Sequence, residues 1–323
     1  MTMNRRDLLM LSAVALSGIA VAEERATKAT SKGAKVLRLW PGTPPGGAGK
    51  LPEEHFEERV QGGVVNRVLV GVAQPQLELV RPRNPNGAAL LLMPGGAYIE
   101  EWIDKEGFEI AERFAAAGIT SFILRYRLPR EGWSQLLDAP LQDAQRAIRV
   151  MRALASELRI DPKRICAMGF SAGGHLAASV STRGSAGYSP VDDADVGSVR
   201  PDLCALLYPL IDMSAVTQNA PIKAAMFGAA ADDSDILAHT PTSSVDHETP
   251  PTFLVNAFDD PLVSPQHSIG YANALREKKV SAELHIFAEG GHGFGVRQPP
   301  SMPVAAWPNL FLTWAARHGY LRS

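Results

Sequence analysis

The chain has 323 residues, with 32 lysines and arginines against 34 aspartates and glutamates, so its formal net charge is −2. Hydrophobic residues make up 46% of it and charged residues 20%, proportions that exclude an intrinsically disordered chain. The near-neutral charge provides no basic surface for a nucleic acid, and two cysteines cannot staple a small disulfide scaffold. No cysteine–histidine spacing resembles a zinc site, and we expect neither a metal nor a cofactor.

The N-terminal segment differs from all that follows it. Arg5 and Arg6 precede an apolar run over residues 8–21, and Ala20-Val21-Ala22 has the small-residue pattern of a cleavage site. This order is typical of a cleaved secretory signal, and the paired arginines resemble a twin-arginine signal. The alternative is a membrane anchor, but a run of about 14 residues is shorter than the roughly 20 that span a bilayer. We therefore expect residues 1–22 to direct export to the periplasm or the medium and to be removed, leaving no membrane attachment.

The next segment, residues 23–60, is rich in glycine, proline and alanine, and we expect an extended N-terminal arm there. Two β-branched stretches between Val64 and Val80 are predicted to be the first strands. Further apolar runs then alternate with segments of helical periodicity. The predicted strands are residues 88–93, 119–126, 164–168, 203–208, 252–256 and 282–287, and the predicted helices are 108–117, 136–158, one from 172, 268–278 and 307–318. The alternation predicts βαβ units and one α/β domain over residues 61–323, with a mostly parallel sheet and helices on both faces.

One segment of this domain breaks the alternation. Residues 213–249 contain small polar residues and several short apolar groups. We interpret them as an insertion between a strand and a helix, which would cover the carboxyl ends of the strands.

Both cysteines lie in predicted strands. Cys166 and Cys204 each belong to an apolar run, so we favour two buried free thiols. A disulfide between them is the alternative for an exported protein.

The strongest signal for chemistry is Gly169-Phe170-Ser171-Ala172-Gly173, which has the pattern G-x-S-x-G. It follows an apolar strand and opens a helix of small residues, the setting of a nucleophile elbow. Ser171 would present its hydroxyl at the carboxyl edge of the sheet, where the following helix directs backbone N–H groups and its positive dipole end. The alternative interpretation is a glycine-rich packing turn.

A serine hydroxyl needs a base to become a nucleophile, and the base needs an orienting carboxylate. His292 and the pair Asp259-Asp260 both follow predicted strands, in the order serine, acid, histidine that α/β-hydrolases have. The other histidines are assigned packing or surface roles. His175, one turn into the helix after Ser171, is expected to point away from the hydroxyl.

Acyl transfer also needs donors for a developing oxyanion. One candidate is the backbone N–H of Ala172, and the loop Gly95-Gly96-Ala97-Tyr98 after an earlier strand offers those of Gly96 and Ala97. The alternative for this loop is an ordinary turn. Because alanine resists positive φ, we expect Ala97 to have a conformation that alanine accepts, or the reach of the loop to differ.

Together these segments resemble the α/β-hydrolase esterases related to acetyl xylan esterases and hormone-sensitive lipase, the bacterial group often labelled xylanase- or dienelactone-hydrolase-like. Met93-Pro94-Gly95-Gly96-Ala97-Tyr98 is similar to the P-G-G-G-Y form of the oxyanion motif, with Ala97 in place of the third glycine. The resemblance covers roughly residues 36–320 and continues in Arg125-Tyr126-Arg127-Leu128-Pro129, Asp161-Pro162-Lys163-Arg164-Ile165 and Gly290-Gly291-His292-Gly293-Phe294-Gly295. In the acid loop, Asn256-Ala257-Phe258-Asp259-Asp260-Pro261-Leu262-Val263 places Asp260 where the fold usually has its aspartate.

The resemblance implies a serine carboxylic-ester hydrolase. His292 would take the proton of Ser171, Asp260 would hold the imidazole, and the oxyanion would be bound by N–H groups of Ala172, Gly96 and Ala97. An exported member is expected to deacetylate xylan-type carbohydrate or to hydrolyse small short-chain esters. A short-chain lipase or carboxylesterase is the nearest alternative, and a serine peptidase or a non-catalytic binding homologue are more distant ones.

Overall fold

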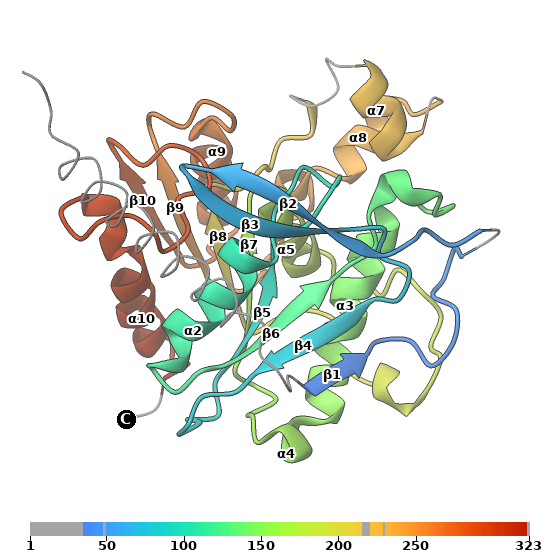
Figure 1. Ribbon diagram of the computed structural model, residues 1–323, viewed down its shortest axis with the longest axis horizontal. Coiled ribbons are helices and arrows are strands. Elements are labelled where there is room, and N and C mark those ends of the chain that lie inside the picture. Colours follow the sequence, from blue (N-terminus) through green and yellow to red (C-terminus); the bar gives the residue numbers. More distant parts are fainter. Residues whose placement is uncertain (1–34, 48–49, 215–219, 229, 322–323) are drawn as a thin grey trace, which may run out of the picture.

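The computed structural model describes residues 35–47, 50–214, 220–228 and 230–321, so the predicted export signal lies outside the described residues. An eight-stranded sheet with strand order β1-β4-β6-β5-β7-β8-β9-β10 forms the centre of the molecule (Figure 1). Its strands are β1 (Lys35–Arg38), β4 (Gln76–Val80), β5 (Ala89–Met93), β6 (Thr120–Arg125), β7 (Ile165–Phe170), β8 (Leu203–Leu207), β9 (Thr252–Ala257) and β10 (Ala282–Phe287). The neighbours from β6 to β10 pair in parallel, whereas β1 and β4 are antiparallel to theirs. The expected mostly parallel α/β sheet is therefore confirmed.

Helices cover both faces of this sheet because its central strands are apolar on both sides. In β5 the side chains of Ala89, Leu91 and Met93 belong to one core cluster, and those of Leu90 and Leu92 to the other. The first cluster is closed by α3 (Asp138–Ala153), α4 (Ala155–Leu158), α5 (Ala172–Thr182) and α9 (Gln266–Glu277). The second is closed by α2 (Glu109–Ala115) and α10 (Trp307–Arg317).

The N-terminal part of the chain is more regular than expected. Within the predicted arm, β1 adds an edge strand to the sheet through its pairing with β4, and β2 (His55–Gln61) pairs with β3 (Val64–Val70) in a separate two-stranded ribbon. Gly62 and Gly63 form the turn of this ribbon with φ of 59° and 77°, values that glycine accepts readily. Most side chains of β1 and β2 are exposed or half-buried, so these strands lack the apolar runs that identify the central strands.

Two further segments differ from expectation. A π-helical turn, Asp104–Phe108, precedes α2, and all five of its residues are buried although three are charged. The insertion between β8 and β9 contains α7 (Ala220–Phe227), α8 (Asp233–Ala238) and the 3₁₀ turn Pro241–Ser244, and this turn packs against α5 and α9. Figure 1 shows α7 and α8 at the upper right, distant from α2 and α10.

Cys166 and Cys204 are both buried free thiols, as favoured.

No helix in the described part of the chain combines the length and the apolar character that a membrane span requires.

Candidate active site

Ser171 lies in a sharp turn between β7 and α5. Its φ is 52°, in the left-handed region that non-glycine residues seldom adopt. The turn needs its two flanking glycines, because a Cβ on Gly169 would lie 2.1 Å from the Gly173 carbonyl oxygen and one on Gly173 would lie 2.0 Å from that of Met93. The backbone of the serine is held by three hydrogen bonds: its own N–H donates to the Leu207 carbonyl, and its carbonyl accepts the N–H groups of His175 and Leu210. This is the geometry of a nucleophile elbow.

The structure brings Ser171, His292 and Asp260 together in one relay. His292 Nε2 lies 2.9 Å from Ser171 Oγ, and His292 Nδ1 lies 2.8 Å from Asp260 Oδ2. A carboxylate only accepts hydrogen bonds, so we assign the imidazole proton to Nδ1, which leaves Nε2 to accept the serine hydroxyl. The Asp260 side chain is fully buried, and its other oxygen accepts the N–H groups of Leu262 and Val263, both at 2.9 Å.

Asp259, the other candidate for the acid, has a different contact. Its Oδ1 accepts the Gly291 N–H at 2.7 Å, and this hydrogen bond lowers the pKa of the Asp259 carboxyl. Asp259 therefore holds the loop that carries His292, whereas Asp260 holds the imidazole itself.

The loop after β5 lies against the nucleophile. A Cβ on Gly95 would be 2.9 Å from Ser171 Cβ, and Gly96 has φ of 137°, which only glycine accepts readily. Ala97 has φ of 55°, so the first alternative for this loop, a conformation that alanine accepts readily, is wrong, while nothing tests the second, a different reach of the loop. Tyr98 also has positive φ, 58°. Within the described ranges no group accepts a hydrogen bond from the backbone N–H of Gly96, Ala97 or Ala172.

The strained Ala97–Tyr98 conformation is held from the side of α5. The Tyr98 hydroxyl lies 2.7 Å from His175 Nδ1, and His175 Nε2 lies 2.6 Å from the His239 carbonyl oxygen. Since a carbonyl only accepts, Nε2 carries the proton and Nδ1 accepts the tyrosine hydroxyl. Burial lowers the pKa of His175 to about 4, so it is neutral at pH 7. His175 thus has a packing role, as interpreted from the sequence.

Glu106 is the residue of this region that the sequence did not reveal. Its carboxylate, in the buried π-helical turn, accepts the Gly95 N–H at 2.7 Å and the Tyr208 hydroxyl at 2.9 Å. The Tyr208 ring in turn packs edge-on against the His292 imidazole, with 5.0 Å between ring centroids. The one available signal was the run of charged residues, Asp104-Lys105-Glu106, a short distance along the chain from the glycine loop.

A pocket of about 370 Å³ opens at Ser171 and His292. One wall is polar: Lys105 Nζ donates to Gln61 Oε1 at 2.6 Å and lies 4.4 Å from the centre of the Trp102 ring. Burial lowers the pKa of Lys105. The remaining lining residues are Gly96, Ala97, Ile99, Glu100, Glu106, Leu262 and Gly293.

This polar wall comes in part from the β2–β3 ribbon and not from the insertion, which the sequence predicts to cover the carboxyl ends of the strands. Gln61 lies at the end of β2, so the β2–β3 ribbon reaches the pocket. The described residues of the insertion, 213–249, do not line it. Of the side chains that the structure describes, no group of three or more histidines, cysteines, aspartates or glutamates is placed to hold a metal ion.

Comparison with known proteins gives a consistent result. A model of the BD-FAE family matches residues 77–275. The acetylxylan esterase of Xylanibacter ruminicola is 31% identical over 224 residues, which are 68% of this chain and 44% of that protein. Endo-1,4-beta-xylanase B of Butyrivibrio fibrisolvens is 34% identical over 212 residues, 64% of this chain and 32% of that protein. The chain thus spans about a third to under a half of the length of these curated relatives.

Solved structures agree on the fold. The acetyl ester-xyloside bifunctional hydrolase of Caldicellulosiruptor lactoaceticus has a TM-score of 0.74 and 29% identity, covering 90% of this chain and 98% of that one. The carboxylesterase Cest-2923 of Lactobacillus plantarum has a TM-score of 0.63 at 22% identity, covers 84% of this chain and 99% of that one, and shows the fold alone.

Proposed function

Because the chain belongs to the BD-FAE family and has the α/β-hydrolase fold, we propose that it is a serine carboxylic-ester hydrolase. The observation that carries this proposal is the relay in which His292 contacts both Ser171 Oγ, at 2.9 Å, and the buried Asp260 carboxylate, at 2.8 Å. This arrangement supplies the base and the orienting acid that a serine nucleophile requires.

In the proposed mechanism, Ser171 Oγ attacks the ester carbonyl carbon while His292 Nε2 takes the hydroxyl proton. The negative oxygen of the tetrahedral intermediate is bound by the N–H groups of Ala172, Gly96 and Ala97. The intermediate collapses when the imidazolium returns its proton to the departing alcohol, and an acyl-enzyme forms. Water then attacks the acyl-enzyme, with His292 again as base, and the acid is released as Ser171 regains its proton.

For the substrate, we propose an acetylated xylan-type carbohydrate. Relatives named for acetylxylan and for acetyl ester-xyloside hydrolysis support this choice. The polar wall of the Ser171 pocket, with Gln61, Lys105 and Trp102, offers hydrogen-bond groups and an aromatic ring to a sugar. A carboxylesterase for small apolar esters is the second candidate, favoured by the exposed side chains of Ile99 and Leu262 beside the same pocket.

Two measurements test this function. A fluorophosphonate probe should label the wild-type protein and not the Ser171→Ala variant, whereas an inert binding protein would not be labelled at all. A series of p-nitrophenyl esters from acetate to octanoate, together with acetate release from acetylated xylan, separates the substrates. Highest kcat/KM on acetate and release from xylan support the carbohydrate substrate, while a preference for longer acyl chains and no release would contradict it.

We further infer that residues 1–22 export the protein through the twin-arginine pathway. The paired Arg5 and Arg6, the apolar run and Ala20-Val21-Ala22 support this inference. Expression of the whole chain in a bacterial host, followed by fractionation and mass measurement of the exported protein, tests it. Export should yield a chain that begins at residue 23, and Arg5→Lys with Arg6→Lys should retain the precursor inside the cell.

A further inference from the structure

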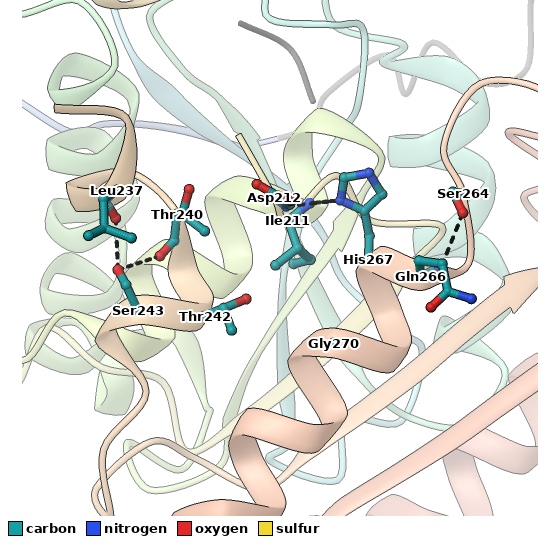
Figure 2. A pocket seen from close by; sticks show the side chains of 10 residues that line it. All are labelled: Ile211, Asp212, Leu237, Thr240, Thr242, Ser243, Ser264, Gln266, His267 and Gly270. Atoms are coloured by element: carbon teal, nitrogen blue, oxygen red, sulfur yellow. Dashed lines mark hydrogen bonds between the residues drawn. The ribbon is translucent and has the colours of Figure 1, made fainter. Parts of the chain in front are cut away.

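We propose that the protein has a second binding pocket, which holds an uncharged sugar residue of the substrate chain remote from the ester. The pocket has about 430 Å³, within the range of ligand sites. It lies between α8 with the turn that follows it, residues 211–212 after β8, and the first turns of α9 (Figure 2). The identity of the ligand as carbohydrate rests on the proposed function, whereas the existence of the pocket and of its hydrogen-bonding groups does not.

The His267 imidazole offers an N–H donor, and its contacts show which ring nitrogen carries the proton. Its Nδ1 accepts the backbone N–H of Asp212 at 2.9 Å and that of Ile211 at 3.2 Å, so the ring proton lies on Nε2. Burial lowers the pKa of His267, which keeps the imidazole neutral. Nε2 lies on the side of the ring opposite the Asp212 backbone (Figure 2), and its N–H has no acceptor among the residues that the structure describes.

Other polar groups of the pocket are also available. The Thr242 hydroxyl and the Gln266 amide make no hydrogen bond to any described residue. The Ser264 hydroxyl accepts the Gln266 N–H at 3.3 Å and keeps its own proton for a ligand. One carboxylate oxygen of Asp212 accepts the Ser214 N–H at 2.9 Å, which leaves the other free to accept. One cavity therefore presents both donors and acceptors, as the hydroxyl groups of a sugar require.

The charges of the lining argue against an anion and against a divalent cation as the ligand. The ten residues that line the pocket include no lysine or arginine, so an anion would have no cation to pair with. Asp212 is the single carboxylate among them, which is too few for a divalent cation. Ile211, Leu237 and Gly270 supply apolar surface for the C–H groups of a ring. A neutral polyhydroxylated ligand matches this mixture.

Two segments of the chain run from the surroundings of Ser171 to the second pocket. The Leu210 N–H donates to the Ser171 carbonyl at 3.0 Å, and the next two residues form a wall of the pocket. In the acid loop, Leu262 lines the Ser171 pocket, and Ser264, two positions later, lines the second pocket. A sugar chain with its ester at Ser171 would thus reach the second pocket across the acid loop.

Substitution of Gly270, which lines the second pocket, tests whether this pocket binds part of the substrate. A Cβ at this position of α9 would meet nothing within 4 Å, so a large side chain fills the pocket without displacing the helix. Gly270→Trp should lower the kcat/KM ratio of acetylated xylo-oligosaccharide to p-nitrophenyl acetate at least tenfold, mainly through KM. Gly270→Ala should leave that ratio unchanged. Gly42→Trp, at an exposed glycine whose Cβ would also meet nothing within 4 Å, controls for an added tryptophan.

A binding measurement separates this inference from the esterase proposal. Unacetylated xylotriose titrated into the Ser171→Ala protein should bind, with a shift of the His267 Nε2–H resonance in NMR, and binding should weaken at least tenfold with Gly270→Trp. Equal affinity in both proteins, or no binding to either, would overturn the second pocket even if ester hydrolysis is normal. Conversely, sugar binding without labelling by fluorophosphonate would overturn the esterase proposal and leave the pocket.

Discussion

The carboxylate of Glu106 accepts the backbone N–H of Gly95 at 2.7 Å and so ties a buried charge to the loop beside Ser171. Its other oxygen accepts the Tyr208 hydroxyl at 2.9 Å, and the Tyr208 ring supports the His292 imidazole. One side chain thereby connects the loop after β5 with the ring that supports the base. Because oxyanion donors act only when they are held in place, Glu106 is in a position to maintain the catalytic geometry without touching substrate.

Glu106→Ala should therefore lower kcat on p-nitrophenyl acetate about tenfold to a hundredfold, with a smaller change in KM. Glu106→Gln keeps an acceptor oxygen and should recover part of the loss. The control is Glu78→Gln, which changes another buried carboxylate, one in β4 that pairs with Arg125 of β6. A uniform loss of folded protein in all three variants, with kcat per folded molecule unchanged, would show that Glu106 only supports the fold.

The two neighbouring aspartates should have unequal effects. Asp260→Asn removes the acceptor that selects the productive tautomer of His292, and kcat should fall by about 10⁴, as for other triads. Asp259→Asn weakens only the bond to the Gly291 N–H and should cost less than about tenfold, since one charge-assisted hydrogen bond is replaced by a weaker neutral one. Steady-state kinetics on p-nitrophenyl acetate compare the matched pair. Equal losses would remove the distinction between the acid and its neighbour.

His175 should make the free energy of unfolding depend on pH. Its pKa is lowered to about 4 in the folded protein, below its ordinary value of 6.5. Between these values the unfolded chain binds the proton and the folded protein does not. The stability that neutral His175 contributes is therefore fully present above pH 6.5 and is lost as pH falls toward 4. Between pH 7 and pH 5 the loss from this residue is about 2 kcal/mol.

Urea unfolding at the two pH values measures this effect. His175→Gln should reduce the difference between pH 7 and pH 5 by about that amount, whereas the exposed His247→Gln should leave it unchanged. An unchanged difference in the His175 variant would mean that this histidine binds its proton over the same pH range in the folded protein as in the unfolded chain, and would contradict the lowered pKa.

Ala97 should tolerate glycine better than a branched residue. At φ of 55° alanine is strained, and glycine is not, although glycine loses more backbone entropy on folding. Ala97→Gly should therefore change the free energy of unfolding by no more than about 1 kcal/mol, in the stabilising direction, and retain activity. Ala97→Val should lower both stability and kcat, because a β-branched residue is poorly accommodated at positive φ. Urea unfolding and kinetics on p-nitrophenyl acetate check both variants, and equal behaviour of the two would contradict strain at this position.

Local sequence patterns are enough to predict the central strands and helices, the elbow at Ser171 and the order in which acid and base follow it. These features are local: an apolar run such as residues 88–93, or two glycines around a serine, has the same physical consequence wherever the chain carries it. By contrast, β1 and β2 were missed because half-exposed edge and ribbon strands need no continuous apolar run.

Contacts between groups that are far apart in the chain cannot be predicted from local patterns, because they depend on the packing of the whole fold. Glu106 contacts Tyr208, 102 positions later in the chain, and Tyr98 contacts His175, 77 positions later. These contacts depend on how parallel strands bring their carboxyl ends to one edge of the sheet, and on a π-helical turn that buries charges which look solvent-exposed in the sequence. The same long-range packing imposes positive φ on Ala97, because hydrogen bonds and contacts from distant residues outweigh the backbone preference of alanine. It also places the β2–β3 ribbon at the Ser171 pocket, whereas residues of the insertion line the second pocket.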